Sequence, residues 1–354
     1  MTYFTISCET AEHGINLYTL SNARGMRIVI SDRGAALVSW FAPDRYGREA
    51  DILLGYRDIG RYVANQAHFG SIVGRWGNRI ADGRFTMDGA DYEVHRNNNG
   101  NHLHGGEAGF HLMQWQVQPD PEGLRMSLVS PDGAAGFPGN VLASVLYRLD
   151  EEGRLQIDYT ATTDAPTPIN LTSHGYFNLN GGADNICDHI LSIDADTYLQ
   201  VNGKLIPERA AEVDGSAFDF RQPAPIGPRL SWPDEQLAIA GGFDHCYCLH
   251  REEADAGEPG GRSQPLREVA TVYDPGSGRL LTVSTTEIGL QFYSGNFLRD
   301  VPGRSAQPYA PHDGFCLEAQ AYPNQINGPE SEAVILRPGQ VYRQTTVYRM
   351  SVRE

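Results

Sequence analysis

The chain has 354 residues, of which 40% are hydrophobic and 20% charged, a composition that excludes collagen-like, coiled-coil and largely disordered proteins. Its formal net charge of −16 argues against a nucleic-acid partner, which needs clustered Lys and Arg, and against binding to an anionic membrane surface. A small neutral ligand is indifferent to this charge.

Alternation of apolar and polar residues with period two predicts β-strands along most of the chain. The clearest predicted strands are residues 26–31, 124–129, 155–162, 280–286 and 340–348. Turn pairs such as Asp88-Gly89 separate such runs, and no stretch holds a helical period over four turns. Short strands with turns at close spacing predict an all-β fold, a large antiparallel β-sandwich, with a large barrel as the alternative. We expect residues 1–354 to form a single domain.

The cysteines and the first residues of the sequence bear on the cellular compartment in which we expect the protein. The five cysteines form an odd, scattered set that is a poor disulfide framework: Cys8, Cys187, Cys246, Cys248 and Cys316. The first residues lack a basic segment followed by an apolar one, and no apolar run approaches the roughly 20 residues of a membrane helix. We therefore expect a cytoplasmic protein with reduced thiols. The polar residues 250–267 are typical of a long exposed loop within the fold.

Two segments in the first third of the chain combine glycines with polar side chains. Residues 74–80 contain Arg75, Asn78 and Arg79, which either form a turn with solvated arginines or contact a ligand. Residues 97–106 contain His102 and His104 two positions apart, a spacing that can begin a metal site. The alternatives are an imidazole that hydrogen-bonds a polar ligand and, for His102, a structural histidine.

Two further segments carry candidate proton-transfer groups. If residues 170–179 form a strand, His174 and Tyr176 share a polar face with Asn170 and Thr172. In residues 313–323, alternation places Glu318 among Phe, Leu and Ala, and such desolvation raises the pKa of a carboxyl group toward that of a useful base. The alternative is an ordinary surface glutamate on an edge strand.

Two shorter pieces add Asp244 in GFDH, and Gln291 together with Tyr293 in LQFYSGNF. Planar amide, carboxylate and guanidinium groups pair with sugar hydroxyls, and aromatic rings stack on the apolar face of a sugar. Together, these side chains favour a carbohydrate site.

The ordered motifs GRWGNRI, NHLHGG, GFPGN, TSHGYFNL, GFDH, LQFYSGNF and CLEAQ resemble the aldose 1-epimerase (galactose mutarotase) family. The resemblance implies a galactose mutarotase-like supersandwich and an isomerase that interconverts α and β anomers of a free aldose, such as glucose or galactose, through ring opening. It implies neither cofactor nor metal. The family's general acid corresponds to His174 and its general base to Glu318.

The same resemblance implies which side chains hold the sugar. Arg79 and His104 match groups near the reacting ring oxygen, with Asn78 in the same cluster, and Asp244 and Gln291 match groups that hold ring hydroxyls. The chain departs from the family at Ser173 and Gly175, which flank His174, and this departure bears on sugar preference.

Three alternatives remain at the level of sequence. A non-catalytic carbohydrate-binding β-sandwich would keep the aromatic and amide groups without needing both His174 and Glu318. A glycoside hydrolase would pair Glu318 with Asp244, and a metal-dependent β-barrel would use the histidines. The expected partner is a small-molecule aldose, and the protein is expected to be a monomer or homodimer. A sugar phosphate is disfavoured because Arg75 and Arg79 are the only candidate anion-binding cluster.

Overall fold

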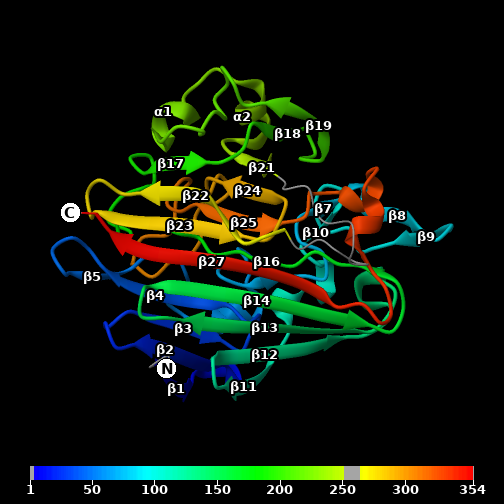
Figure 1. The fold of residues 1–354 in the computed structure, drawn as a ribbon, viewed down its shortest axis with the longest axis horizontal. Coiled ribbons are helices and arrows are strands. Elements are labelled where there is room, and N and C mark those ends of the chain that lie inside the picture. The colour runs from blue at the N-terminus through cyan, green and yellow to red at the C-terminus, as the bar shows by residue number, and fades with distance from the viewer. Residues whose placement is uncertain (1–3, 251–263, 354) are drawn as a thin grey trace.

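The computed structural model describes residues 4–250 and 264–353. Strands dominate it, and the α-helices of the described residues are short: α1 (Ile226–Leu230) and α2 (Glu235–Ala240) (Figure 1). In this part of the chain, no helix is long and apolar enough to cross a membrane. The predicted loop at 250–267 falls largely outside the described residues.

A nine-stranded antiparallel sheet forms one layer of the molecule, with the order β11-β12-β13-β14-β27-β23-β22-β17-β20. Its strands are β11 (Gln116–Asp120), β12 (Gly123–Ser130), β13 (Val141–Leu149), β14 (Arg154–Thr163), β17 (Ile190–Ile193), β20 (Ala224–Pro225), β22 (Arg267–Tyr273), β23 (Arg279–Thr285) and β27 (Tyr342–Val352). β27 lies in the middle of this sheet, paired with β14 on one side and β23 on the other.

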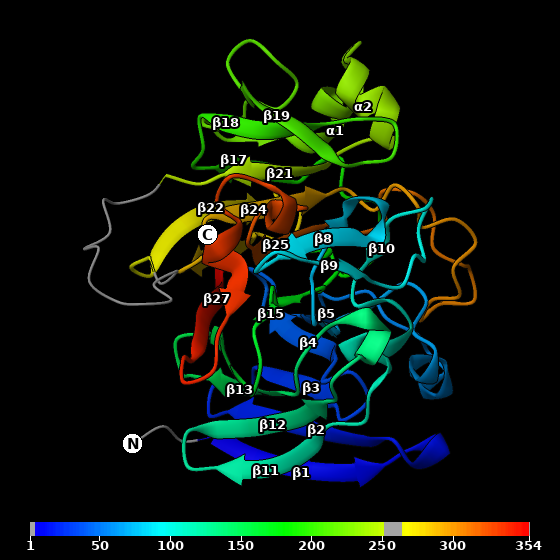
Figure 2. The ribbon, with the colours of Figure 1, turned by 90° about the vertical axis from the view of Figure 1, so that its right-hand side faces the viewer.

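Two five-stranded antiparallel sheets form the opposing layer (Figure 2). The first consists of β1 (Phe4–Thr10), β2 (Asn16–Asn22), β3 (Arg27–Ser31), β4 (Leu37–Pro43) and β5 (Glu49–Asp51) in chain order. The second has the order β19-β18-β21-β24-β25 and consists of β18 (Thr197–Val201), β19 (Pro207–Glu212), β21 (Asp244–Cys248), β24 (Gly289–Tyr293) and β25 (Cys316–Gln320).

Four two-stranded pairs connect the layers. They are β6 (Ile72–Val73) with β16 (Thr172–Ser173), β7 (Arg79–Ile80) with β10 (His102–Leu103), β8 (Arg84–Met87) with β9 (Ala90–Glu93), and β15 (Thr167–Pro168) with β26 (Ile335–Leu336). The described 3-10 helices are Glu12–Gly14, Ile59–Val63, Ala81–Gly83, Gly106–Ala108, Phe110–Leu112, Ala134–Gly136, Gln325–Asn327 and Ser331–Val334. Asp88 and Gly89 both have positive φ, so the predicted turn between β8 and β9 is a tight type I′ hairpin.

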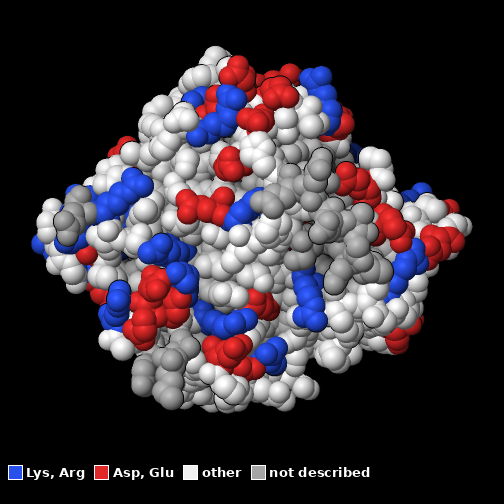
Figure 3. Space-filling view, viewed as in Figure 1, with Lys and Arg blue, Asp and Glu red and all other residues white. Residues whose placement is uncertain are grey.

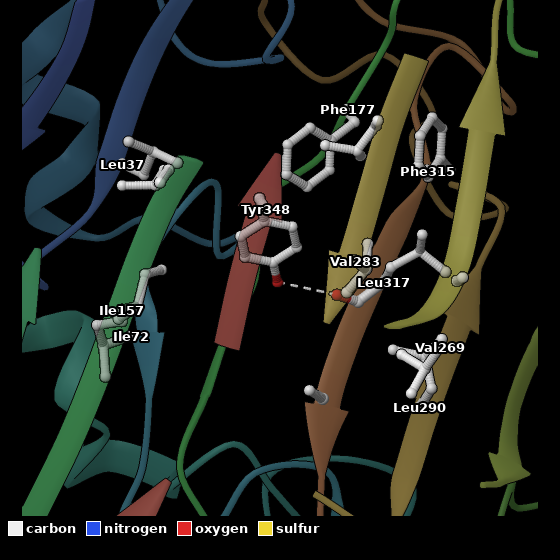
Figure 4. Packing of buried hydrophobic residues seen from close by; sticks show 14 of the residues in the cluster. Leu37, Ile72, Ile157, Phe177, Val269, Val283, Leu290, Phe315, Leu317 and Tyr348 are labelled. Atoms are coloured by element: carbon white, nitrogen blue, oxygen red, sulfur yellow. Dashed lines mark hydrogen bonds between the residues drawn. The ribbon is translucent and has the colours of Figure 1, made fainter. Parts of the chain in front are cut away.

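One apolar core lies between the layers, and residues from all three large sheets contribute to it. Tyr348 of β27 contacts the opposing layer. Its ring centroid lies 5.3 Å from that of Phe177, and its hydroxyl donates a 3.0 Å hydrogen bond to the carbonyl of Leu317 in β25 (Figure 4). The strands of the nine-stranded sheet bury alternate residues. On the face seen in Figure 3, acidic and basic side chains are interspersed rather than gathered by sign.

The predicted all-β sandwich is confirmed, and so are its clearest strands. Residues 26–31, 124–129, 155–162 and 280–286 correspond to β3, β12, β14 and β23, each to within two residues at either end. The last predicted strand, 340–348, runs further, since β27 extends to Val352. Hydrophobic alternation located these strands because each has one buried face and one solvated face.

The prediction of a strand through residues 170–179 is wrong. Only Thr172–Ser173 pairs as a strand, with β6, and the flanking residues follow an irregular buried path. Asn170 does not face a ligand: its side-chain nitrogen donates to the carbonyl of Gly77 at 3.0 Å, and its oxygen accepts from the amide of Ala321 at 2.9 Å. Polar side chains in this segment satisfy buried backbone, a role that period-two alternation does not reveal.

Candidate active site

A cavity of about 630 Å³ opens beside the edge strand β25 and contains most of the predicted site residues. Six of the seven line it: Asn78, Arg79, His104, His174, Asp244 and Glu318. These side chains are nearly buried, whereas Arg61, Phe297 and Arg299 lie exposed at the outer part of the same cavity. Gln291 does not line the cavity. The volume is within the usual range for small-molecule sites.

Glu318 stands in the middle of β25, on the strand face opposite to that of Leu317 and Ala319, which pack in the core. It lies on an edge strand, but the interpretation as an ordinary surface glutamate is wrong because only 3% of it is exposed. Its Oε2 has no hydrogen-bond partner among the described residues. Burial, reinforced by Asp244, raises the pKa of Glu318 well above its usual 4.5, and Arg79 partly opposes the shift.

His174 directly follows β16 and is fixed through its backbone. Its N–H donates to the carbonyl of Ser71 at 2.9 Å, and its carbonyl accepts from the N–H of Gly70 at 2.9 Å. Its Nδ1 lies 3.5 Å from Sγ of Cys316. Burial, with a smaller effect of His68, lowers the pKa of His174 to about 3. A neutral Cys316 thiol that donates to Nδ1 leaves the imidazole proton on Nε2.

His174 and Glu318 meet across the inner end of the cavity, with 3.8 Å between Nε2 and Oε1. Burial favours the neutral form of each group, so the pair retains one proton over a wide pH range. With this proton on Glu318 both groups are neutral, whereas with the proton on His174 the pair consists of an imidazolium that can donate a proton and a carboxylate that can accept one. This arrangement can move one proton onto a bound molecule while it takes another away.

The β7–β10 pair places Arg79 and His104 on the cavity wall. The backbone N–H of Asn78 donates to Nδ1 of His104 at 3.2 Å, which leaves the proton of the neutral ring on Nε2. The next residue, Gly105, has φ +84°, and a Cβ there would stand 1.9 Å from the carbonyl oxygen of Gly74. Glycine is therefore required beside His104 for the chain to approach Gly74 this closely.

Asp244, at the start of β21, lines the cavity and also contacts the polar side chains of Gln291 and Arg79. Its Oδ1 accepts a 2.7 Å hydrogen bond from Nε2 of Gln291, and its Oδ2 lies 3.9 Å from Nη1 of Arg79. Burial raises the pKa of Asp244, and Arg79 and Gln291 oppose the shift. Gln291 stands directly opposite Glu318 in the β24–β25 ladder. The structure therefore places Gln291 behind Asp244, as a group that holds the carboxylate in place.

The histidine pair at 102 and 104 is not a metal site in this structure. Nδ1 of His102 lies 2.8 Å from the carbonyl of His95, and its Nε2 accepts from the N–H of Gly105 at 3.2 Å. Both ring nitrogens of this fully buried residue therefore serve the backbone, in agreement with the structural alternative. A different set, His174, Cys316 and Glu318, offers ligand atoms that all lie within 4.8 Å of one another.

Arg75 has a role different from that of Arg79. Its guanidinium is buried and donates to the carbonyls of Pro138 (2.8 Å) and Gly139 (3.0 Å) and to the hydroxyl and carbonyl of Ser130 (2.8 and 3.2 Å). Burial lowers the pKa of Arg75 to about 10. The interpretation of solvated arginines is wrong for both residues, and Arg75 anchors the GFPGN segment rather than a ligand.

Sequence reasoning missed two side chains beside the proton-transfer pair. His68 lines the cavity, and its ring stacks 5.7 Å from that of His174 and lies 4.9 Å from that of His104. Burial lowers its pKa to about 4. Its surroundings in sequence, QAHFG, carry no recognisable pattern. Cys316 lies in the CLEAQ motif at i−2 from Glu318, so strand alternation was a signal that placed it on the same face.

The fold and the cavity together define a class: a β-sandwich enzyme with a buried imidazole–carboxylate pair in a polar, sugar-sized site. Comparison with known families agrees, since the model of the family described as aldose 1-epimerase matches residues 16–349. The chain belongs to the aldose 1-epimerase family and is an isomerase.

Characterised relatives cover nearly the whole chain. Galactose mutarotase from Bos taurus is 42% identical over 330 residues, and the human protein is 41% identical, each with 92% of both chains covered. Aldose 1-epimerase from Escherichia coli K12 is 38% identical, with 94% of both chains covered.

Solved structures share the fold. The GalM/aldose epimerase homologue from C. elegans has a TM-score of 0.85 at 26% identity, and galactose 1-epimerase from Lactobacillus acidophilus has 0.82 at 27%, each with full coverage of both chains. The expected supersandwich is thereby confirmed.

Proposed function

We propose that Glu318 and His174 are the proton acceptor and proton donor with which this isomerase interconverts the α and β anomers of a free aldose. The observation that carries this proposal is the 3.8 Å approach of the two side chains at the buried end of the cavity. The alternative of a non-catalytic carbohydrate-binding sandwich is not favoured, because the characterised relatives are mutarotases and epimerases.

Mutarotation requires two proton transfers. Glu318 takes the proton of the anomeric hydroxyl while His174 protonates the ring oxygen, and the C1–O5 bond breaks to give the open-chain aldehyde. Rotation about C1–C2 presents the other carbonyl face. On closure, His174 recovers its proton from O5 and Glu318 returns one to O1, so the pair ends as it began. Each positioned proton-transfer group typically contributes roughly 10²–10⁴ in rate.

The neighbouring groups suit supporting roles. Arg79, on β7, and His104, directly after β10, stabilise charge that develops on the ring oxygen. Asp244 accepts hydrogen bonds from ring hydroxyls and is oriented for this by Gln291, which donates to its Oδ1 at 2.7 Å. Arg79, His104 and Gln291 are buried and only 11% of the Asp244 side chain is exposed, so little bulk water competes for the sugar.

Polarimetry of freshly dissolved α-D-glucose and α-D-galactose tests the proposal. Glu318→Gln keeps the size of the side chain but removes the base, and we expect kcat to fall by about 10²–10⁴. Glu208→Gln, a change on strand β19 outside the cavity, serves as the control. An unchanged rate in the Glu318 variant would remove the assignment.

Galactose and glucose are proposed substrates because relatives carry the name galactose mutarotase and because the cavity is lined by neutral and mixed-charge polar groups. We also propose a cytoplasmic, single-domain protein that acts as a monomer or homodimer. The shared core of the three large sheets supports the single domain.

A further inference from the structure

At the inner end of the cavity, His174 and Glu318 lie next to the buried thiol of Cys316, and these three side chains offer different ligand types that the proton-transfer mechanism uses only in part. Cys316 and Glu318 lie two residues apart on β25, so both side chains project from the same face of the strand. His174 approaches that face from the segment after β16. One ligand atom from each of the three lies within 4.8 Å of the others, and all three residues are buried.

The distance between the thiol and the imidazole fits a tetrahedral metal. Zn²⁺ binds thiolate at about 2.3 Å and imidazole nitrogen at about 2.0 Å, which sets two such ligands about 3.5 Å apart at the tetrahedral angle. Sγ of Cys316 and Nδ1 of His174 are 3.5 Å apart. Oε1 of Glu318 lies 3.8 Å from the other ring nitrogen, Nε2, so the carboxylate must turn toward Nδ1 to join the same ion as Cys316.

One oxygen of the Glu318 carboxylate is available to bind a ligand. Oε2 of Glu318 is buried and has no hydrogen-bond partner in the part of the chain that the structure describes, although a buried charged oxygen is costly when it is unpaired. A sugar hydroxyl fills this position in catalysis, and a divalent cation would fill it equally well. His174 and Glu318 line the cavity, so a water molecule or a sugar hydroxyl that enters it could supply a fourth ligand.

The chemical types of the three ligand atoms indicate which metal ions the site favours. A thiolate and an imidazole favour Zn²⁺ and related soft or borderline ions over Mg²⁺ and Ca²⁺, which prefer oxygen ligands. Three protein ligands and one open position are also the usual composition of an accessible zinc site.

We propose that His174, Cys316 and Glu318 form an inhibitory binding site for Zn²⁺. Binding replaces the thiol proton of Cys316 with a metal–sulfur bond and displaces the proton that the His174–Glu318 pair holds; both protons are released to solvent, and no electron is transferred. The ion occupies the imidazole and the carboxylate that move protons during mutarotation, so it stops the reaction. The inhibitory effect rests on the proposed function, but the binding does not.

Cobalt titration of the purified, metal-free full-length chain tests the binding directly. Co²⁺ substitutes for Zn²⁺, and a cobalt–thiolate bond gives a charge-transfer band in the near ultraviolet. We expect one equivalent of Co²⁺ to produce this band and one equivalent of Zn²⁺ to abolish it. Cys316→Ala should eliminate the band, whereas Cys8→Ala, a change at an exposed free cysteine of β1, should leave it intact.

Zinc affinity gives a second measurement. Losing even an outer partner of a metal ligand typically costs about 10–100-fold in affinity, so loss of the Cys316 ligand should weaken Zn²⁺ binding by more than about tenfold in calorimetry. No saturable one-to-one binding, or a thiolate band that survives in Cys316→Ala, would overturn the site.

Inhibition is measured separately, by polarimetry with glucose. We expect Zn²⁺ to inhibit competitively with the sugar and a chelator to restore the rate. If Co²⁺ binds through Cys316 and mutarotation continues unchanged, the assignment of His174 and Glu318 as the proton-transfer pair fails while the metal site stands. If the thiolate band is missing, the metal site alone fails.

Discussion

Nε2 of His174 lies 3.8 Å from Oε1 of Glu318, although the two residues come from separate parts of the fold, the segment after β16 and the edge strand β25. The separation is slightly longer than a hydrogen bond. The reacting C1–O5 edge of a sugar can therefore lie beside both groups, each of which then contacts a different oxygen. This relationship underlies the first prediction.

His174→Asn should lower kcat by about 10²–10⁴ and change KM little, because the variant retains a polar side chain but cannot protonate the ring oxygen. Polarimetry over a range of glucose concentrations separates the two constants. His13→Asn, at an exposed histidine outside the cavity, is the matched control and should behave as the unmodified protein. Equal loss of activity in both variants would point to a nonspecific effect.

Asp244→Ala should act mainly on binding and raise KM, because its carboxylate is expected to hold sugar hydroxyls. Gln291→Leu should raise KM as well, although Gln291 does not line the cavity, because its hydrogen bond orients Asp244. The double variant should therefore be little worse than Asp244→Ala alone. Additive effects on KM would show that Gln291 contacts the sugar by itself.

Replacing Arg75 should mainly lower stability, whereas replacing Arg79 should mainly lower activity. Arg75→Met leaves several buried carbonyl and hydroxyl oxygens without a donor, so we expect the free energy of unfolding to fall by about 3 kcal/mol or more. Arg79→Met removes a cavity group and should lower kcat with a smaller loss of stability. Urea unfolding and polarimetry on both variants give the comparison, and the reverse pattern would refute the distinction.

Stability should fall as the solution is acidified below about pH 6.5. Burial lowers the pKa of seven histidines, and for His68 the change is from 6.5 to about 4. The seven are His68, His102, His104, His111, His174, His189 and His245.

Between these pH values the unfolded chain binds protons that the native histidines do not, so the free energy of unfolding decreases as pH falls. Three buried carboxyl groups with raised pKa act in the opposite direction but are outnumbered: Asp51, Asp244 and Glu318. Urea unfolding at a series of pH values measures the slope. A stability that stays constant from pH 7 to 4 would contradict the prediction.

The strands of the large sheets could be predicted because each obeys one simple rule. β12 and β14 expose one face and bury the other, so their pattern alternates regularly. Residues 170–179 could not be predicted in this way, because His174 and Asn170 are buried for different reasons, one to face the cavity and the other to satisfy backbone groups. Local pattern cannot distinguish these two kinds of burial.

The candidate site was predictable in its members but not in its geometry. Motif resemblance selected six residues that line one cavity, yet it did not show that Gln291 stands behind Asp244 or that Arg75 binds backbone. It also gave no reason to select His68, which reaches the cavity only because residues distant in sequence fold against it. Such relationships depend on tertiary packing, which short sequence patterns do not encode.

The central position of β27 has a consequence for biosynthesis. Because residues 342–352 pair with both β14 and β23, a nascent chain holds two unpaired strand edges until these residues have left the ribosome. Tyr348, whose hydroxyl donates to the carbonyl of Leu317 next to Glu318 in β25, belongs to the same strand. A chain that lacks this strand would leave the edges of β14 and β23 open to pairing with other chains and should therefore be both inactive and prone to aggregate.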